Sequence, residues 1–294
     1  MSQTEPTMRS FEAMGTRFEC VLAGFGRGMT SATHATAAAE EVERIVREWH
    51  DLLSAFSPNS AISRINTAET GGPVRVPRDL LDLLARAKSY TSDTLGAFDI
   101  TLGALMARHG FRGEETGSDS YGADALLIDE RASTIRLARP GVRLDLGAIA
   151  KGFALDRCVE ELRDLGVTSA LLHGGTSSVI AIGTRPDAHP WQIQISADHP
   201  DTPVVELSDS AMSVSEPRGR IIDGRGHILD PRRGESADRV ELACVRGPSA
   251  EVCEIWSTAL VVDPNLIQQL PVGYRAHARI DQQWISTNKQ AACA

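Results

Sequence analysis

Two segments of the chain combine residue types that suit a phosphorylated ligand held together with a hard cation. Asp145-Leu-Gly-Ala-Ile-Ala-Lys-Gly152 places an acid, two glycines and a lysine directly after a strand-like run that begins at Val142. A glycine turn at a helix start offers backbone N–H groups to an anion, and a lysine adds positive charge. Glu254 and Thr258 lie four positions apart, which places a carboxylate and a hydroxyl on one helix face. Oxygen donors of this kind suit Mg²⁺.

Each segment also has a purely structural interpretation, and the residues alone leave both open. Residues 145–152 fit a strand end, a turn and a helix with a solvated lysine, and they match neither the P-loop nor the dinucleotide-binding fingerprint. The structural interpretation of the second segment is that Glu254 is exposed and that the Thr258 hydroxyl bonds back to a carbonyl of its own helix. The apolar neighbours Ile255 and Leu260 favour a mostly buried helix, in which Glu254 needs a charge partner or a metal.

Three further segments have the same ambiguity. Gly96-Ala-Phe-Asp99 fits either a glycine C-cap or a tight loop against a ligand. His173-Gly-Gly-Thr-Ser-Ser178 fits either a hairpin turn or flat backbone behind a ligand. His227 precedes an acid by three residues and is followed by two arginines. A lone histidine is more often structural, but these neighbours favour a group that handles protons or phosphate.

The elements that must position these residues are helices mixed with hairpin-like strands. Residues 8–24 predict a strand broken at Met14-Gly-Thr16, and Ser60 is a candidate cap for a short helix ending near Asn66. The apolar spacing predicts helices over 31–53, 77–91 and 251–262, and the β-rich stretch after Gly166 predicts strands that include 170–173, 179–182 and 239–245. This pattern predicts an α+β fold with a mainly antiparallel sheet.

Composition excludes several classes of protein. The 294 residues are 42% hydrophobic and carry a net charge of −9, which argues against nucleic-acid binding. Five cysteines, an odd number without zinc-site spacing, favour a reducing compartment. No apolar run is long enough for a membrane span. The start at Met1 shows no basic and apolar leader pattern, so we expect a cytoplasmic location.

Taken in order, the motifs resemble those of the ApbE family, the FAD:protein FMN transferases. The resemblance extends from about residue 8 to residue 286. Each motif alone has little specificity, and the resemblance depends on their occurring together in the same order. The matching segments are Met14-Gly-Thr16, Phe56-Ser-Pro-Asn-Ser60 with Asn66, Gly96–Asp99, Asp145–Gly152, Gly174-Gly175, His227–Gly234 and Glu254–Ala259.

The resemblance implies an ApbE-like, T-fold-related α+β fold with a mainly antiparallel sheet, packed helices and a ligand site between two lobes. It implies a single flavin transferase domain over residues 8–286, and we expect disordered tails at 1–7 and 287–294. By similarity, the residues that line the FAD site are Met14, Phe56, Ala97, Phe98, Asp99, Asp145, Lys151 and Ile228. The implied metal ligands are the backbone carbonyl of Ala148, the side chain of Glu254 and the hydroxyl of Thr258.

The implied reaction is the Mg²⁺-dependent transfer of FMN from FAD to a Ser or Thr hydroxyl of an acceptor flavoprotein, with release of AMP. FAD is then a substrate, and His227 and Lys151 are the candidate catalytic residues. Two alternatives stay open: an FAD diphosphatase that yields FMN and AMP, and a non-catalytic FAD-binding protein. The sequence names neither the acceptor nor the oligomeric state.

The chain departs from the family pattern at two acids. Glu254 stands where the family has Asp, which keeps the charge but adds one methylene in front of a cation with strict geometry. Glu216 replaces a glycine and places an acid where it would repel a diphosphate. If the longer arm is merely tolerated, Glu254→Asp is expected to raise activity.

Overall fold

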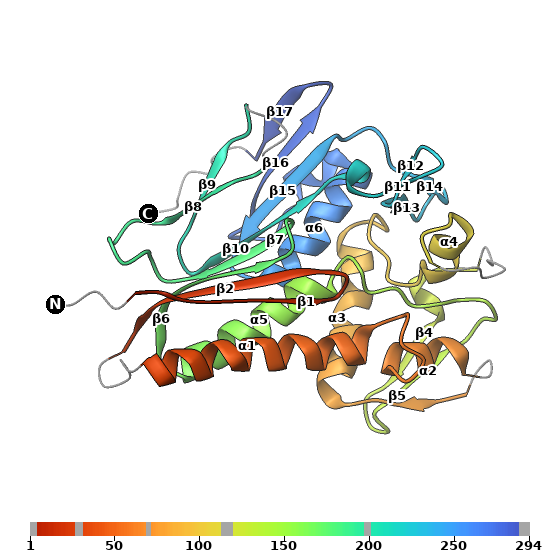
Figure 1. Ribbon diagram of the computed structural model, residues 1–294. Helices are drawn as coiled ribbons and strands as arrows, with labels where there is room; N and C mark the ends of the chain where they lie inside the picture. The colour runs from red at the N-terminus through yellow and green to blue at the C-terminus, as the bar shows by residue number, and fades with distance from the viewer. Residues whose placement is uncertain (1–4, 27–31, 69–71, 113–119, 197–200, 288–294) are drawn as a thin grey trace. The chain divides into compact units, whose positions relative to one another are not determined.

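The computed structural model describes residues 5–26, 32–68, 72–112, 120–196 and 201–287 (Figure 1). The chain forms two compact units, each assembled from three stretches of sequence. The first unit contains Met1–Thr67, Asp145–Ser213 and Gly247–Glu254, and the second contains Ala68–Leu144, Val214–Arg246 and Ile255–Ala294. A single domain over 8–286 stays a prediction. Of the expected tails, residues 1–4 and 288–294 lie outside the described residues, whereas Thr7 begins a strand and the Thr287 N–H donates to the Ala276 carbonyl.

The first unit is built on antiparallel strands in the order β1-β2-β6-β7-β10. β1 (Thr7–Ala13) and β2 (Thr16–Phe25) form a hairpin that turns where the sequence predicts a break. β6 (Val167–Gly174) and β7 (Ser178–Ile182) form the predicted Gly-Gly hairpin. The remaining strands are β8 (Trp191–Gln194), which pairs with β9 (Val204–Leu207), and β10 (Ser210–Ser215), which pairs with β7.

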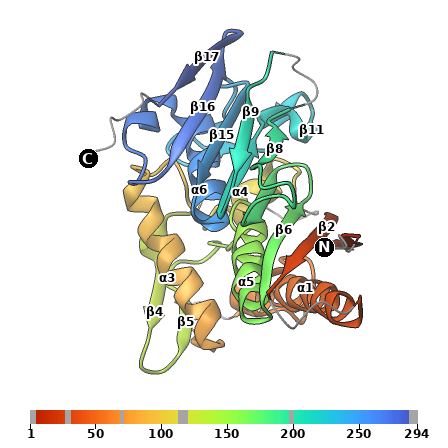
Figure 2. The same ribbon diagram turned by 90° about the vertical axis from the view of Figure 1, so that its left-hand side faces the viewer.

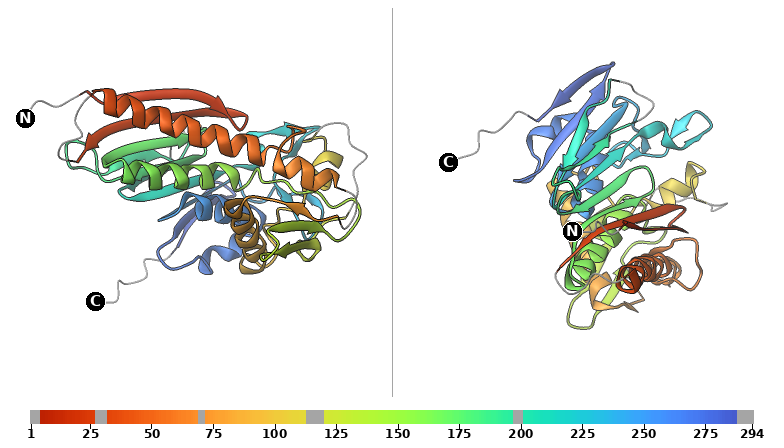
Figure 3. Two further views of the ribbon diagram at one scale, coloured as in Figure 1. Left: turned by 90° about the horizontal axis from the view of Figure 1, so that it is seen from below. Right: turned by 60° about the vertical axis from the view of Figure 1, so that its left-hand side comes forward.

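Two helices run side by side along this sheet, α1 (Ala32–Leu53) and α5 (Ala150–Asp164) (Figures 2 and 3). The Trp49 ring of α1 meets the Phe153 ring of α5 edge-on, with centroids 4.5 Å apart. This contact holds α1 against α5. The apolar face of α1 is buried, as its amphipathic pattern predicts. The short helix α2 (Ala61–Thr67) is capped as predicted, since the Ser60 hydroxyl accepts the Ser63 N–H at 2.9 Å.

The start of α6 (Ala250–Val262) also belongs to the first unit, where it meets the start of α5. A Cβ added at Gly152 would lie 2.3 Å from the Ala250 carbonyl oxygen and 2.7 Å from the Glu251 nitrogen. Backbone cannot yield to such an atom as a flexible side chain can. Gly152 is therefore the residue that allows the two first turns to approach each other closely.

The second unit places α3 (Arg78–Asp93) beside a small sheet of β3 (Val74–Arg75), β5 (Thr134–Leu137) and β4 (Leu126–Asp129) (Figure 2). Four leucines of α3 are fully buried, as its apolar spacing predicts. Leu102, Leu105, Phe111 and Leu229 form a further apolar cluster around α4 (Gly103–Arg108). Six-residue α4 was not predicted, because so short a helix shows little periodicity.

The rest of the second unit is the later part of α6 and antiparallel strands β15 (Leu242–Gly247), β16 (Arg275–Ile280) and β17 (Gln283–Ser286). Two small hairpins pair β11 (Ile221–Ile222) with β12 (Arg225–Gly226) and β13 (Leu229–Asp230) with β14 (Glu235–Ser236). The 3₁₀ turns are η1 (Ala123–Ala125), η2 (Pro217–Gly219) and η3 (Pro264–Gln268).

In the part of the chain that the structure describes, none of the helices is long and apolar enough to span a bilayer. Cys20, Cys158, Cys244 and Cys253 are buried free thiols, and burial raises the pKa of Cys20 to about 11. The fifth cysteine, Cys293, lies outside the described residues.

We predict that Gly152→Ala lowers the free energy of unfolding by about 1–3 kcal/mol, because the new methyl forces two backbones apart. The matched control is Gly26→Ala, whose Cβ would meet the Gly166 carbonyl oxygen at an ordinary 3.6 Å. Urea unfolding of both variants measures the difference. Equal stability of the two variants would contradict the close approach of α5 and α6.

Candidate active site

The Glu254 carboxylate lies in the first unit and is only 3% exposed. Its Oε1 is 2.6 Å from the Lys151 Nζ and accepts the Ser178 hydroxyl at 2.6 Å, while its Oε2 accepts the Gly152 N–H at 2.8 Å. The alternative in which Glu254 is exposed to solvent is therefore wrong. The lysine turn and the distant acid, about a hundred residues apart, are in direct contact.

Burying a carboxylate is costly unless a counter-charge and hydrogen bonds replace the lost water. Lys151, with its side chain 19% exposed, supplies that charge. The first turn of α5 supplies a backbone N–H, since its N-cap residue, Ile149, makes no side-chain cap bond. A negative group at a helix N-terminus is also favoured by the helix dipole. Glu254 thus acts as the cap that Ile149 cannot provide.

The reverse contact holds the first turn of α6. Asp156 of α5 accepts the Ser249 hydroxyl at 2.7 Å, the Ala250 N–H at 2.8 Å and the Glu251 N–H at 2.9 Å. Burial raises the pKa of Asp156 to about 6, against the opposing effect of these hydrogen bonds. Each helix therefore caps the other with a carboxylate. The bonds from Asp156 hold the first turn of α6, and so they also fix the position of Glu254 in the next turn.

Thr258 follows Glu254 by one turn of α6, as the spacing predicts, and belongs to the second unit. Its hydroxyl oxygen is 3.3 Å from that of Ser215, which is 2.8 Å from that of Ser257. In the first unit, the Asp145 carboxylate accepts the Gly147 N–H at 2.8 Å and so shapes the turn that carries half-buried Ala148. A role for Ala148 and Thr258 as metal ligands stays a prediction.

Two of the expected FAD-lining residues of the first unit lie at turns. Met14 has a φ of +51° at the tip of the β1–β2 hairpin, and its N–H donates to the His50 Nδ1 at 3.0 Å. Phe56 is 68% exposed, on a turn whose N–H groups bond to the Ser54 hydroxyl. Stacking of this exposed ring on a flavin or adenine stays a prediction. His50, which holds the Met14 turn, was not foreseen.

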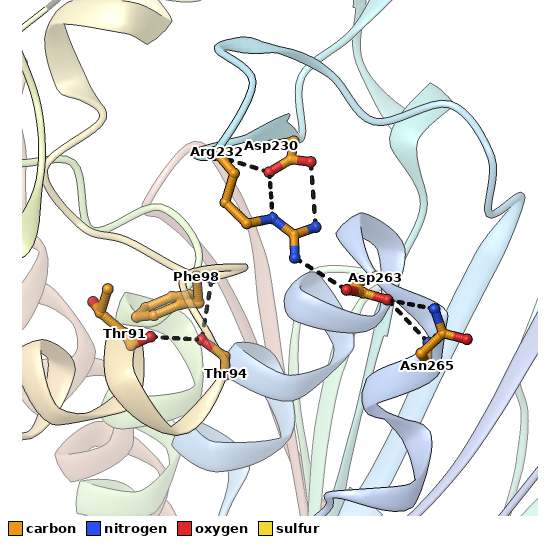
Figure 4. A network of polar contacts seen from close by, with 7 residues as sticks. All are labelled: Thr91, Thr94, Phe98, Asp230, Arg232, Asp263 and Asn265. Carbon is orange, nitrogen blue, oxygen red and sulfur yellow. Dashed lines mark hydrogen bonds and ion pairs between the residues drawn. The ribbon is translucent and has the colours of Figure 1, made fainter.

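The Gly96–Asp99 loop lies in the second unit, just beyond Thr94, the C-cap of α3, and forms the helix-ending turn that was one of its two interpretations. Gly96 has a φ of +78° and its N–H donates to the Thr91 carbonyl at 2.8 Å. Ala97 and Phe98 are buried, and the Phe98 N–H donates to the Thr94 hydroxyl at 3.2 Å (Figure 4). The Asp99 carboxylate accepts the N–H and hydroxyl of Thr101 and the N–H of Ala123, and burial raises its pKa. Asp99 therefore anchors the loop.

The segment from His227 to Gly234 belongs to the same unit. The His227 ring lies edge-on to Phe111, with centroids 6.4 Å apart, and Ile228 is buried. Arg232 binds Asp230 on its own hairpin and Asp263 just beyond α6 (Figure 4). The aliphatic part of the same arginine lies 3.7 Å from the Cβ position of Gly96. Arg232 thus brings the two predicted ligand segments of this unit together.

The donors around Glu254 that could hold a cation are oxygen atoms of mixed type. In the described ranges, no three His, Cys, Asp or Glu side chains gather closely enough to hold an ion. A cation at Glu254 would have to use hydroxyl and backbone oxygens as well, which are the donor types of Thr258 and Ala148. All three are hard oxygen donors, so the chemistry of the set fits Mg²⁺.

The comparisons with known proteins decide the family. The model of the ApbE family matches residues 14–270, which is most of the chain. The chain belongs to the ApbE family. This ApbE chain is 30% identical over 263 residues to the FAD:protein FMN transferase of Klebsiella pneumoniae (strain 342), covering 83% of this chain and 81% of the relative. It is 25% identical over 285 residues to the FAD:protein FMN transferase of Haemophilus influenzae, covering 88% and 81%.

Solved structures agree with the expected fold. The flavinyl transferase ApbE of Pseudomonas stutzeri, in its apo form, superposes with a TM-score of 0.82 at 26% identity, covering 98% of this chain and 96% of that one. The ApbE protein of Thermotoga maritima superposes with a TM-score of 0.84 at 23% identity, covering 97% of each chain. The expected ApbE-like α+β fold with mainly antiparallel strands and packed helices is confirmed.

Sequence reasoning missed Asp156 and Ser178 of this ApbE chain. A serine just before a helix is a recognisable N-cap pattern, and Ser249 has that position before α6. Its hydroxyl accepts the Val252 N–H at 3.3 Å. Asp156 gave none, because it lies inside a helix and its partners are more than ninety residues away. Ser178 was part of the hairpin motif but was not singled out. Such contacts leave no periodic mark in the sequence.

Asp156 predicts a pH dependence of stability. Burial raises its pKa from the ordinary value of 3.8 to about 6 in the folded chain, so between these pH values the native state binds more protons than the unfolded state. Its contribution to the free energy of unfolding therefore rises by up to about 2 kcal/mol as the pH falls from 7.5 towards 4. The negative charge of the neighbouring Glu251 also raises the pKa of Asp156.

The measurement is urea unfolding of the wild type and of Asp156→Asn across this pH range. Taking the difference between the two cancels the titration of all other groups. A difference that stays constant from pH 7.5 to pH 4.5 would show that the pKa of Asp156 is not raised.

Proposed function

We propose that this ApbE protein is an FAD:protein FMN transferase, which moves FMN from FAD to a Ser or Thr hydroxyl of an acceptor protein and releases AMP. The main support is the 30% identical relative of that name, aligned over 83% of this chain. The site adds a physical reason, because a buried acid held against a lysine at a helix start is an arrangement that a diphosphate ligand and its cation can use. A cytoplasmic location stays a prediction.

The proposed metal is Mg²⁺, held by the Ala148 carbonyl, the Glu254 carboxylate and the Thr258 hydroxyl. When bound, it would neutralise the charge of the diphosphate. Lys151 holds the Glu254 carboxylate in place through their 2.6 Å ion pair. Its contact with Glu254 changes the expectation for this lysine, which the resemblance places beside the diphosphate. Binding of FAD would therefore require Lys151 to share its charge between Glu254 and a phosphate oxygen.

The remaining residues bind FAD and handle the proton. The Met14 turn and the Gly96–Asp99 loop, each fixed by its own hydrogen bonds, are the segments proposed to contact FAD. The acceptor hydroxyl oxygen forms a bond to the FMN-side phosphorus, the bond from that phosphorus to the bridging oxygen breaks, and AMP leaves with that oxygen. His227, whose ring is positioned by Phe111, would take the hydroxyl proton.

The proposal is tested by incubating the purified protein with FAD, Mg²⁺ and a candidate acceptor flavoprotein. A fluorescent acceptor band on a denaturing gel, with one AMP released per FMN attached, is the expected result. FMN and AMP formed equally well without acceptor would indicate an FAD diphosphatase, and bound but intact FAD would indicate a non-catalytic FAD-binding protein. Either result contradicts the proposed transfer.

Glu254→Gln is expected to lower the transfer rate roughly 100-fold or more, since it removes the charged oxygen donor proposed for the cation. The matched control is Glu160→Gln, which changes an exposed carboxylate of α5 that pairs with Arg157. Its rate should equal that of the wild type. Full activity of Glu254→Gln would rule out the proposed metal role.

A further inference from the structure

The longer side chain of Glu254 ends on a buried serine. Ser178, the first residue of β7, is fully buried, and its hydroxyl donates to the Glu254 Oε1 at 2.6 Å. Its backbone lies between two neighbouring strands, opposite Gly174 of β6 and Ser213 of β10. The hydroxyl therefore projects from a rigid part of the sheet, and it meets the same carboxylate oxygen that binds Lys151.

The length of the residue at position 254 decides whether this contact forms. Asp at the same position would end about 1.5 Å short, the length of one carbon–carbon bond. The backbone of α6 cannot move to restore the contact, because Gly152 and Asp156 fix its first turn. A 2.6 Å hydrogen bond lengthened to that extent lies beyond hydrogen-bonding range. The extra methylene, in which the chain departs from the family pattern, is thus what allows the carboxylate to reach the Ser178 hydroxyl.

We propose that Ser178 is a positioning residue for the flavin-transfer site, which acts through Glu254 and is matched to the extra methylene of that side chain. The inference rests on the proposed function and specifies how its metal site is held. Hydrogen bonds from such neighbouring groups orient a ligating carboxylate, and their loss typically lowers metal affinity about 10–100-fold. Because an aspartate at position 254 would not reach Ser178, Glu254→Asp is no longer expected to raise activity. This replaces the expectation drawn from the sequence, in which the longer side chain is merely tolerated.

The proposal is tested with a double-mutant cycle of Ser178→Ala and Glu254→Asp. The probe is Mn²⁺ in the presence of FAD, with free Mn²⁺ measured by electron paramagnetic resonance. Ser178→Ala is expected to weaken Mn²⁺ binding about 10–100-fold in the wild-type background. In the Glu254→Asp background the same change should alter binding less than about 3-fold, because the shorter acid does not reach the serine.

Three further variants separate positioning from packing. Thr176→Ala, at an exposed residue of the same hairpin, should leave Mn²⁺ binding unchanged. Ser178→Thr keeps the hydroxyl and should restore most of the affinity. Ser178→Cys keeps the size with a weaker donor, and it should lose affinity like Ser178→Ala, which keeps the test valid if the alanine variant does not fold.

An equal loss in both backgrounds, or no loss in the wild-type background, would overturn the role of Ser178. If the wild type transfers FMN and binds Mn²⁺ while the cycle shows no coupling, this inference alone fails. If the wild type neither binds Mn²⁺ nor transfers FMN, the proposed function fails, and the positioning role fails with it.

Discussion

The candidate site depends on the reciprocal capping of α5 and α6, in which a carboxylate of each helix binds N–H groups in the first turn of the other. Asp156 of α5 holds the N–H groups that begin α6, and Glu254 of α6 holds the N–H of Gly152 in α5. A helix start is a region of unpaired donors and positive partial charge, so each acid is stabilised by the other helix. Because Gly152 has no side chain, the two turns can come close enough for both contacts to form.

This arrangement also explains how the unit accommodates the buried Glu254 and the partly buried Asp156. Glu254 contacts a lysine and a serine in addition to a backbone N–H, whereas Asp156 accepts backbone N–H groups and a serine hydroxyl. Burial outweighs these hydrogen bonds and raises the pKa of Asp156. The acid beside the lysine is thus the one whose charge is directly balanced, which suits a group meant to meet a cation and a diphosphate.

Local patterns in the sequence predicted the elements well where periodicity was strong. The helix over α1 was predicted to within one residue, and the hairpin turns at Met14 and Gly175 were placed by glycine. The strand expected over 239–245 begins later, at Leu242, because the apolar run does not mark where pairing starts. Long-range contacts escaped prediction. The sequence indicated that Lys151 and Glu254 serve one ligand, but not that they bind each other or that Ser178 joins them.

The order of these contacts along the chain has a consequence for biosynthesis. The first unit needs three separate stretches, and the last of them, Gly247–Glu254, follows the second by more than thirty residues. While a ribosome is still adding residues before that point, α5 has no partner for Gly152 or Asp156, and its first turn stays uncapped. Pairing over such long sequence separations is slow, since the intervening loop must be closed first. The nascent protein therefore completes this unit only after Glu254 has been added, and until then its unpaired surface is exposed to aggregation.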